Sequence, residues 1–382
     1  MKRRGNREGS IYKRKDGRWC GALFLGYDFQ GKPIRKYFYG KTRQEVVEKL
    51  TKALRDQQVG LLSVKNDQTF GEWIWSYLEL YKKQQVRPTT YELYRTILKK
   101  HLPPRLASIQ LSKLRPEHLQ RLYLEMSKKG LTRSIRILHV IINSSLKQAL
   151  KLGYVYRNVA EAVTLPRYEQ KEIRVLSQEE IGKFLSAAKK HRLYPAFLLL
   201  LVTGLRRGEL LGLKWEDVDF EKGAITIKRN LVYVNSKTFF QEPKTKHSQR
   251  SVPLPDIALI ELKKWRKKWL EERMKLGSGW PETDLVFPSE IHTPINPRNF
   301  LRTLKNILRE AGLPQDVTIH SLRHTCATML LSSGEHPKIV QELLGHSSVT
   351  ITLDTYSKVM PGLKEQAVKK LEQALKKVYP QD

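Results

Sequence analysis

Polar and apolar positions alternate with a period of two near the start of the chain, and with a period of three to four in most of the remainder. Two early segments, "GSIYKRKDGRWCGALFLGYD" and "GKPIRKYFYG", show the short period, and Asp16-Gly17 divides the first of them. Alternation around an Asp-Gly pair is typical of a β-hairpin. The next segment, "KTRQEVVEKLTKALRDQQVG", has helical spacing and ends at Gly60. Residues 1–65 are therefore predicted to form a small three-stranded sheet followed by a helix.

Helical spacing continues through residues 66–165. Apolar side chains recur every three or four residues in the segments "TFGEWIWSYLELYKKQQ", "RPTTYELYRTILKKHL", "RPEHLQRLYLEMSKKG" and "TRSIRILHVIINSSLKQALKLG". This spacing puts the apolar side chains on one face of each helix. Thr69 is a candidate N-cap of the first helix, and Gly130 and Gly153 are typical stop signals. Together the four segments predict a helical bundle.

The longest part of the chain, residues 172–382, follows a polar segment. "VTLPRYEQKEIRVLS" (163–177) has the composition of an interdomain linker. Helical patterns dominate after it, with one strand-rich cluster at residues 223–255. The predicted fold class is multidomain and mainly α with small β elements: a three-stranded sheet plus helix at 1–65, a helical bundle at 66–165 and a mixed α/β domain at 172–382.

The composition points to a polyanionic partner. The chain carries 70 Lys and Arg against 38 Asp and Glu, a formal net charge of +32 on 382 residues. Binding to phosphates relieves the self-repulsion of such a chain and releases counterions, so nucleic acid is the first candidate. A ribosomal protein or a membrane-surface protein would share this charge. Only two cysteines occur and no long apolar run is present, which predicts a soluble, cytoplasmic protein without a disulfide framework.

The first 65 residues are a candidate DNA-binding unit, with 17 Lys and Arg against six Asp and Glu. Basic and aromatic residues interleave on the predicted strands, and a sheet can lie in the major groove of DNA. The candidate DNA-binding residues are Lys13, Arg14, Arg18, Trp19, Arg35 and Tyr37. The alternative is a small solvated sheet whose aromatic residues form its only core.

A first polar motif, "TGLRRGELLGLKWEDV", spans residues 203–218. Thr203-Gly204 breaks an apolar helix and places Arg206 beside the N-terminus of the next helix, an end that favours an anion. Glu209, three residues on, can hold this arginine by a charge-assisted hydrogen bond. Such a pair is also common as a purely structural contact.

A second motif, "QEPKTKHSQRSVPLP" (241–255), is predicted to be a hairpin turn between two strands. It carries Lys244 and Lys246, and a lysine on a turn can reach a substrate as a proton donor or a point charge. The structural alternative is a solvated lysine.

The segment "TIHSLRHT" (318–325) places His320 and His324 four residues apart on one helical face. This spacing suits a metal ion. Arg323 shares the face, however, and its permanent positive charge repels a bound cation.

The last motif is "QELLGHSSVTITLDTYSK" (341–358). Gly345 is predicted to end one helix, His346 lies at the break, and Ser347 or Ser348 can cap the next helix. Tyr356 follows ten residues after His346, where a structural role in packing is the alternative.

The ordered set of an arginine, a lysine, a His-x-x-Arg pair, a Gly-His pair and a tyrosine resembles the tyrosine recombinase family, the phage-type integrases. The resemblance rests on "TGLRRGEL", "HSLRHT" and "LLGHSSVTITLDTYS" and covers residues 172–360, the catalytic domain. The helical segment is similar to the family's core-site-binding domain, and the basic sheet to its arm-site-binding domain. An arm-site-binding domain implies a three-domain integrase of a mobile element, such as a phage or a conjugative transposon.

The resemblance implies DNA strand exchange through a 3′-phosphotyrosine, with no metal or other cofactor. The implied catalytic residues are Arg206, Lys244, His320, Arg323, His346 and Tyr356, with Glu209 and His324 as supporting residues. Tyr356 is expected to attack a backbone phosphate, whose developing charge Arg206 and Arg323 stabilise. Glu209 is expected to orient the first arginine or a neighbouring histidine, and His324 to support the site from its helix.

The remaining roles concern protons. Lys244 is expected to protonate the leaving 5′-oxygen, with Lys246 as the alternative on the same turn. His320 is the expected general base for the tyrosine, and His346 a hydrogen-bond donor to a non-bridging oxygen.

The implied partners are double-stranded DNA attachment sites, a homotetramer assembled on DNA, an accessory DNA-bending protein and an excisionase, with no membrane. The segment "LKEQAVKKLEQALKK" (363–377) is expected to form a tail helix that docks on a neighbouring subunit.

Three other functions remain open. A type IB topoisomerase would use the same nucleophile without exchanging partners, and a DNA-binding regulator would carry a vestigial catalytic domain. A metalloenzyme would use His320, His324 and His346, although metal catalysis requires convergent carboxylates and Glu209 is the one acid among the implied site residues.

Overall fold

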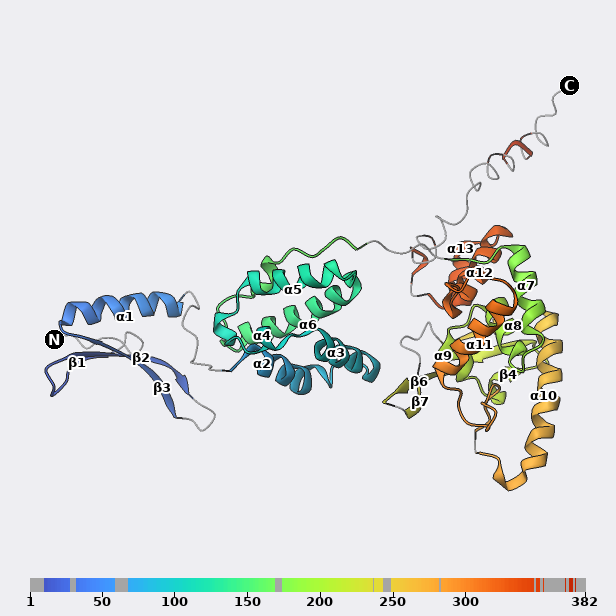
Figure 1. The fold of residues 1–382 in the computed structure, drawn as a ribbon, viewed down its shortest axis with the longest axis horizontal. Coiled ribbons are helices and arrows are strands. Elements are labelled where there is room, and N and C mark those ends of the chain that lie inside the picture. Colours follow the sequence, from blue (N-terminus) through green and yellow to red (C-terminus); the bar gives the residue numbers. More distant parts are fainter. Residues whose placement is uncertain are drawn as a thin grey trace. The chain divides into compact units, whose positions relative to one another are not determined.

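The computed structural model describes residues 10–27, 32–58, 68–168, 174–235, 237–242, 249–281, 283–346, 348–350, 353, 368, 371–373 and 375. It divides into two compact units, Met1–Glu169 and Gln170–Asp382 (Figure 1). The predicted fold class, mainly α with small β elements, is confirmed. The predicted boundary between residues 65 and 66 falls in a segment outside the described residues, so the division of the first unit into two domains stays a prediction.

The N-terminal segment is a three-stranded antiparallel sheet covered on one face by a helix. The elements are β1 (Ser10–Lys13), β2 (Trp19–Tyr27), β3 (Pro33–Gly40) and α1 (Arg43–Gln58), with strand order β1-β2-β3. Leu23 on the sheet packs against Leu50 and Ala53 of α1. At Gly21 a Cβ atom would lie 2.8 Å from Val46 Cγ1, so the helix contacts the sheet where a side chain is missing. The hairpin at Asp16-Gly17 and the helix were predicted correctly.

The second segment of this unit is helical. Its elements are α2 (Phe70–Tyr77), the π-helix η1 (Leu78–Lys82), α3 (Pro88–His101), α4 (Pro104–Ala107), the 3₁₀ turn η2 (Leu111–Lys113), α5 (Pro116–Lys128), α6 (Thr132–Lys151) and the 3₁₀ turn η3 (Val159–Ala162). Thr69 caps α2 as predicted, because its hydroxyl accepts from the Glu72 N–H while the Glu72 carboxylate accepts from the Thr69 N–H. The four predicted helices are present, and the sequence pattern did not predict the single turn α4.

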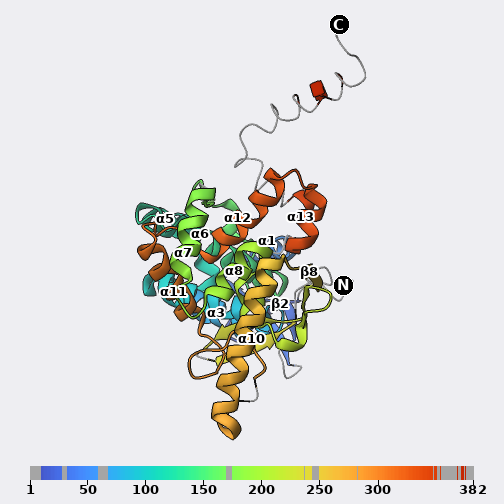
Figure 2. The ribbon, with the colours of Figure 1, turned by 90° about the vertical axis from the view of Figure 1, so that its right-hand side faces the viewer.

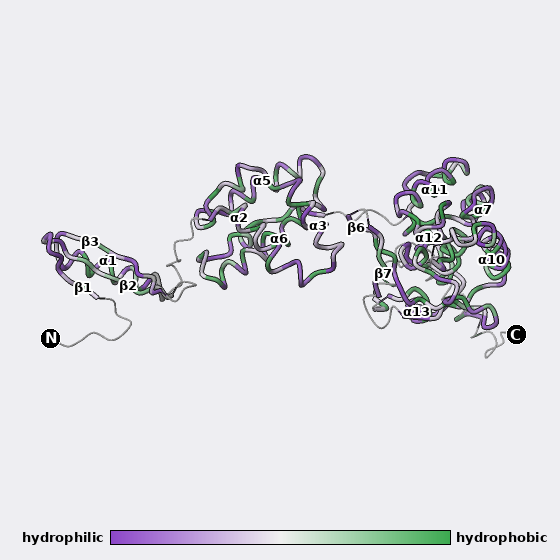
Figure 3. Tube along the Cα trace, turned by 90° about the horizontal axis from the view of Figure 1, so that it is seen from below, coloured by the Kyte–Doolittle hydropathy of each residue, from purple (hydrophilic) through white to green (hydrophobic). Residues whose placement is uncertain are grey.

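Each long helix of this segment turns one apolar face inward. Along α5 and α6, hydrophilic and hydrophobic positions alternate (Figure 3). Ile135, Leu138, Ile142 and Leu146 of α6 are almost fully buried, and they form the centre of the core. The sequence periodicity therefore predicted the core-facing stripe correctly.

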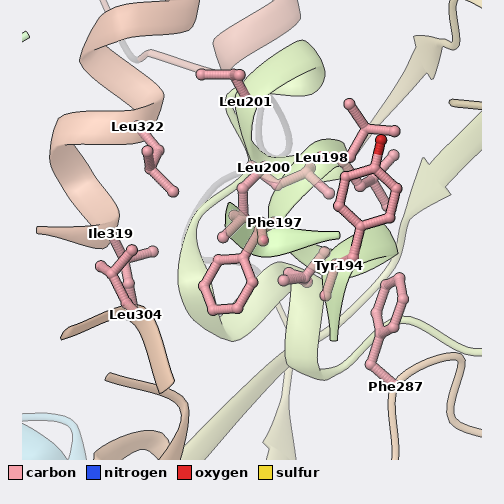
Figure 4. Packing of buried hydrophobic residues seen from close by; sticks show 14 of the residues in the cluster. Tyr194, Phe197, Leu198, Leu200, Leu201, Phe287, Leu304, Ile319 and Leu322 are labelled. Atoms are coloured by element: carbon pink, nitrogen blue, oxygen red, sulfur yellow. The ribbon is translucent and has the colours of Figure 1, made fainter. Parts of the chain in front are cut away.

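The second unit is built around the apolar helix α8. Its helices are α7 (Gln178–Ala188), α8 (Tyr194–Thr203), α9 (Arg207–Leu211), the 3₁₀ turn η4 (Trp215–Asp217), α10 (Asp256–Leu276), the 3₁₀ turn η6 (Gly277–Gly279), α11 (Pro297–Glu310), α12 (Ile319–Ser332) and α13 (Pro337–Leu344). Figure 2 shows α8 behind α10. Phe197 of α8 stacks on Phe300 of α11, while Ile319 and Leu322 of α12 complete the core (Figure 4). Because α8 is buried all round, it holds the surrounding helix ends in fixed positions.

The strands of this unit form two small sheets. They are β4 (Val218–Asp219), β5 (Ala224–Ile227), β6 (Asn230–Val234), β7 (Lys237–Gln241) and β8 (Arg250–Pro253), arranged as β4-β5-β8 and β6-β7. The predicted hairpin turn at residues 241–255 is wrong, since β7 pairs with β6 and β8 pairs with β5. Alternation reveals a strand but not its partner, and the tight hairpin lies at Asn235, whose φ is 50°.

No helix in the described part of the chain is long and apolar enough to cross a membrane.

Candidate active site

Four helix ends of the second unit meet at one cluster of polar side chains. The helix α8 ends at Gly204, α9 begins after Arg206, α12 begins after Thr318, and α13 ends at Gly345. Gly204 and Gly345 both adopt the left-handed conformation, with φ of 61° and 66°. That conformation is typical of the residue after a helix, and it turns the chain back toward the cluster.

Arg206 precedes α9, as the sequence predicted. Its backbone N–H donates to Glu209 Oε2 at 2.9 Å, and its Nη1 donates to Glu209 Oε1 at 2.7 Å. Its Nη2 donates to the Gly345 carbonyl at 2.8 Å, so the side chain joins α9 to the end of α13. About a third of the Arg206 side chain, 36 %, is exposed. The guanidinium is therefore held in place, while part of the side chain is exposed.

Glu209 is buried between two arginines. Arg250, at the start of β8, donates from Nη2 to Glu209 Oε2 at 3.0 Å, the oxygen that also accepts from the Arg206 N–H. Burial alone would raise the pKa of Glu209, but the charges and hydrogen bonds of Arg250 and then Arg206 outweigh it and lower the pKa. Glu209 is thus an anion that binds two cations.

The sequence pattern did not predict a role for Arg250. Its side chain is 7 % exposed and also donates from Nε to the Leu343 carbonyl at 2.7 Å. In the sequence it is one arginine in "HSQRSVP", without a helical spacing to the other motifs, and its partner Glu209 lies 41 residues away. No local pattern distinguishes it from the many other basic residues.

Arg323 lies deeper than Arg206. It is 3 % exposed, and its two terminal nitrogens donate to the carbonyls of Gly204 and Leu344 at 2.7 and 2.8 Å. A Cβ atom on Gly204 would overlap Leu344 Cδ2, so the ends of α8 and α13 lie in direct contact beside this arginine.

His320 and His324 follow each other along α12. Thr318 caps this helix through a hydrogen bond from the Ser321 N–H, which fixes its first turn. The two imidazole rings lie 6.3 Å apart between centroids, in an edge-on arrangement. Partial burial lowers the pKa of His320, and Arg323 and Arg206 lower it further. Burial, followed by the neighbouring His320, lowers the pKa of His324 to about 4.

His346 follows the end of α13. Its backbone N–H donates to the Gln341 carbonyl, and the Gln341 side chain donates to the His346 carbonyl, at 3.1 and 2.9 Å. Burial lowers the pKa of His346 to about 3, with Arg323 and Arg206 as the next causes. All three histidines are therefore neutral near pH 7 and can accept or donate a proton. The described residues contain no group of three or more side chains arranged to hold a metal ion.

The cluster combines three guanidinium groups, three neutral imidazoles and one carboxylate. Such a set suits an anion with several oxygens, because arginine donors match the geometry of phosphate. Neutral imidazoles beside it can take up or release a proton during a reaction at that phosphate.

Comparisons with known proteins agree with this chemistry. The phage integrase family matches residues 174–361, and the N-terminal SAM-like domain of phage integrases matches residues 69–127. A relative named "Tyrosine recombinase XerC-like", from Caldanaerobacter subterraneus subsp. tengcongensis, is 35 % identical over 92 % of this chain and 94 % of its own length. The chain belongs to the phage integrase family. It is a tyrosine site-specific recombinase.

Two further similarities concern the length and the fold of this recombinase. The ICEBs1 integrase of Bacillus subtilis is 24 % identical and covers 96 % of this chain and 100 % of its own length. The solved structure of the Tn1549 transposon integrase with a circular intermediate DNA is 21 % identical, with a TM-score of 0.68 over 80 % of this chain and 99 % of that chain. The second likeness shows that the two chains share a fold.

Some predicted catalytic residues of this tyrosine recombinase lie outside the described residues: Lys244, its alternative Lys246, and Tyr356. All three fall within the part of the chain that the phage integrase family matches. Ser348 is described, and its hydroxyl accepts from the Thr350 N–H, as expected for a helix cap on the way to Tyr356. The roles of these residues stay predictions.

The six candidate DNA-binding residues do not share one face of the N-terminal sheet. The strand register places Arg35 and Tyr37 on the face away from α1, and the Arg14 guanidinium lies over the ring of Tyr39 on that face. Lys13 and Trp19 pair in the row that faces α1, because neighbouring residues of a strand point to opposite sides. Arg18 lies in the hairpin turn, where it donates to Asp16. The open face also carries three exposed aromatic residues outside the predicted set, Tyr12, Phe24 and Tyr39.

Proposed function

We propose that this tyrosine recombinase integrates and excises a mobile DNA element by cutting and rejoining double-stranded DNA at attachment sites through a 3′-phosphotyrosine. The observation that carries the proposal is the cluster in which Arg206, held by Glu209, and the buried Arg323 lie with three neutral histidines. The relatives named integrases match nearly the whole chain, including its N-terminal sheet, which supports a role in the movement of an element.

In the proposed reaction the Tyr356 oxygen attacks a backbone phosphorus and displaces the 5′-oxygen of the next nucleotide. The tyrosine proton passes to His320, whose lowered pKa keeps the imidazole neutral and able to accept it. Lys244, or Lys246 beside it, gives a proton to the departing 5′-oxygen. The bond energy is kept in the phosphotyrosine ester, so a 5′-hydroxyl of the partner strand reverses the step.

Arg206 and Arg323 are proposed to stabilise the charge on the non-bridging oxygens. Arg206 is the more exposed of the two, and it is therefore the arginine that a phosphate meets first. Arg323 is buried, and its two terminal nitrogens already donate to backbone carbonyls. It is therefore proposed to contact the phosphate through N–H groups that also donate to those carbonyls. His346 is proposed to donate to a non-bridging oxygen.

Two supporting roles follow from the contacts around these groups. Glu209 is proposed to orient Arg206, to which it is bonded through both the backbone and the side chain. His324 is proposed to act through packing, because its ring lies beside His320 along α12 and its pKa of about 4 keeps it neutral.

The open face of the N-terminal sheet is proposed to contact arm-type DNA. Arg35 and Tyr37 lie on that face with Arg14, and Tyr12 and Tyr39 extend the same aromatic surface. Aromatic and basic residues on one face of a sheet suit a DNA groove and its phosphates. This surface supports the assignment of the arm sites to residues 1–65. For the rest of the chain, we propose that residues 66–165 bind core sites and that residues 172–382 carry out catalysis.

The proposed assembly is a homotetramer on two attachment sites, acting with a DNA-bending protein and an excisionase in the cytoplasm, in association with the nucleoid. Strand exchange between two duplexes requires four cleavages, and one subunit supplies one tyrosine for each.

The test is a covalent trapping experiment. The full-length chain is incubated with duplexes that carry the joined ends of the mobile element and a nick beside the cleavage site. After cleavage the short fragment at the nick diffuses away, and the protein stays attached to the DNA. We expect a protein–DNA adduct that resists denaturant and is absent with Tyr356→Phe. A Tyr356→Phe variant that still forms the adduct would identify another nucleophile, and a wild-type chain that forms none would contradict the proposed function.

A further inference from the structure

Three consecutive carbonyls at the end of α13 each accept a hydrogen bond from a different arginine. The pairs are Leu343 with Arg250, Leu344 with Arg323 and Gly345 with Arg206, at 2.7, 2.8 and 2.8 Å. The last carbonyls of a helix lack partners within the helix and form the negative end of its dipole. Cations from three separate elements therefore hold the end of α13, directly before His346.

Arg250 closes a ring of hydrogen bonds in this arrangement. It bridges the Leu343 carbonyl and Glu209, and Glu209 in turn accepts from Arg206. Arg206 returns to the backbone at Gly345, two residues after Leu343. A shift of any member of the ring therefore moves the others.

The position of Arg250 is sterically defined as well. A Cβ atom on Gly345 would lie 2.8 Å from Arg250 Nη1, so the guanidinium lies directly against the backbone that carries His346. The Arg250 side chain is 7 % exposed, against 36 % for Arg206. Arg250 is thus placed behind the phosphate-facing arginine and does not itself present a surface to DNA.

We propose that Arg250 is a positioning residue for DNA cleavage, which bridges Glu209 and the Leu343 carbonyl and thereby sets Arg206 and His346 against the scissile phosphate. This inference rests on the proposed function, and it adds a residue that acts through other side chains. Arginine suits the task because its planar fork donates in fixed directions to two acceptors at once. A lysine supplies the same charge from a single nitrogen and cannot reproduce both bonds with the same geometry.

The experiment compares Arg250→Lys and Arg250→Gln with the wild-type chain. Single-turnover cleavage of the nicked duplex is measured at saturating protein, together with the Kd for intact duplex and the midpoint of thermal unfolding. Arg192→Lys is the matched control, because Arg192 also donates to a backbone carbonyl, that of Pro288, and pairs with a glutamate, Glu272. Neither partner of Arg192 belongs to the catalytic cluster.

We expect both Arg250 variants to cleave on the order of 10- to 100-fold more slowly, since a misplacement of about 1 Å can cost that much. The Kd for DNA should stay close to the wild-type value, and Arg192→Lys should cleave at the wild-type rate. Wild-type cleavage by Arg250→Lys would overturn the proposal, because charge alone would then suffice. The proposal would also be overturned if Arg192→Lys lost as much stability as the Arg250 variants and cleaved as slowly as they do. Any destabilised fold would then give the same effect.

A second measurement needs no DNA. Burial is the main cause of the low pKa of His346, and Arg250 is among the cations that add to it. In the folded Arg250→Gln variant, an NMR titration of the His346 ring should therefore show a higher pKa than in the wild type. An unchanged value would show that Arg250 does not set the surroundings of His346. If the wild-type chain forms no adduct, the proposed function fails, while this titration still decides whether Arg250 sets the surroundings of His346.

Discussion

At the scale of the residue, arginine is used for its geometry as much as for its charge. Arg206, Arg250 and Arg323 each bond to at least one backbone carbonyl, and two of them also bind Glu209. Fixed donor directions let one side chain bind a carbonyl and a carboxylate together. The positions of the three guanidinium groups are therefore determined before any phosphate arrives, which is what electrostatic stabilisation of a transition state requires.

The histidines of the cluster predict a dependence of stability on pH. The pKa values of His324 and His346 in the folded chain, about 4 and 3, lie below the ordinary value near 6.5 that applies to the unfolded chain. The unfolded chain takes up protons first as the pH falls below 6.5, so the folded state loses stability from about pH 6.5 down to about pH 4 through His324 and down to about pH 3 through His346. We expect a loss on the order of 1 kcal/mol for each histidine at pH 5.

Denaturant unfolding at pH 7 and pH 5 measures this loss. The double variant His324→Gln/His346→Gln removes both titrating groups, and it should show a weaker pH dependence than the wild-type chain. Equal pH dependence in the two proteins would contradict the low pKa values.

At the scale of the element, the site is a meeting point of helix ends. The C-terminal ends of α8 and α13 carry carbonyls that accept from arginines, and the N-terminal ends of α9 and α12 carry Arg206 and His320. The buried helix α8 keeps these ends together, because neighbouring helices pack on all of its sides. Catalytic groups at helix ends are thus positioned by the packing of the whole unit.

A glycine at one of these ends gives a test at this scale. Gly204→Ala is expected to be destabilising twice over, since its φ of 61° costs an alanine about 1–2 kcal/mol and the overlap with Leu344 costs about 1–3 kcal/mol more. Gly312→Ala is the matched control, because Gly312 has a φ of 65° in open space. Denaturant unfolding should show the larger loss for Gly204→Ala; equal losses would mean that the contact with α13 is readily relieved.

At the scale of the whole molecule, the net charge of +32 fits a chain that binds DNA along much of its length. The C-terminal tail adds a further surface. Val368, Leu371 and Leu375 are helical, spaced so as to lie on one face, and 63 %, 60 % and 57 % exposed. An apolar helical stripe of this kind suits the proposed docking on a second copy of the chain.

Deletion of residues 362–382 is therefore expected to impair recombination between two sites more than binding to one site. The loss of recombination should be on the order of tenfold or more, since a multivalent assembly amplifies the loss of one contact. A gel assay with two labelled duplexes measures both quantities. The triple variant Val368→Ser/Leu371→Ser/Leu375→Ser should repeat the defect and Gln373→Ser should not. Recombination at the wild-type level after the deletion would contradict the docking of the tail.

The sequence by itself determined the helices, the N-terminal sheet and the residues at helix ends. Periodicity fixes which side chains share a face, and a glycine or a capping threonine marks an end, so Thr69, Gly204 and Gly345 could be interpreted locally. The bond between Arg206 and Glu209 was predictable for the same reason, because the two residues are three positions apart at the start of a helix. The family motifs then supplied the expected order of the catalytic residues.

Only the tertiary structure decided which elements pair and which charges meet. The partners of β7 and β8, the face of the N-terminal sheet that α1 covers, and the bonds of Arg250 all involve residues that are distant in sequence. Local patterns contain no information on such pairings, because packing around a buried helix and charge compensation at Glu209 select them only when the chain is folded.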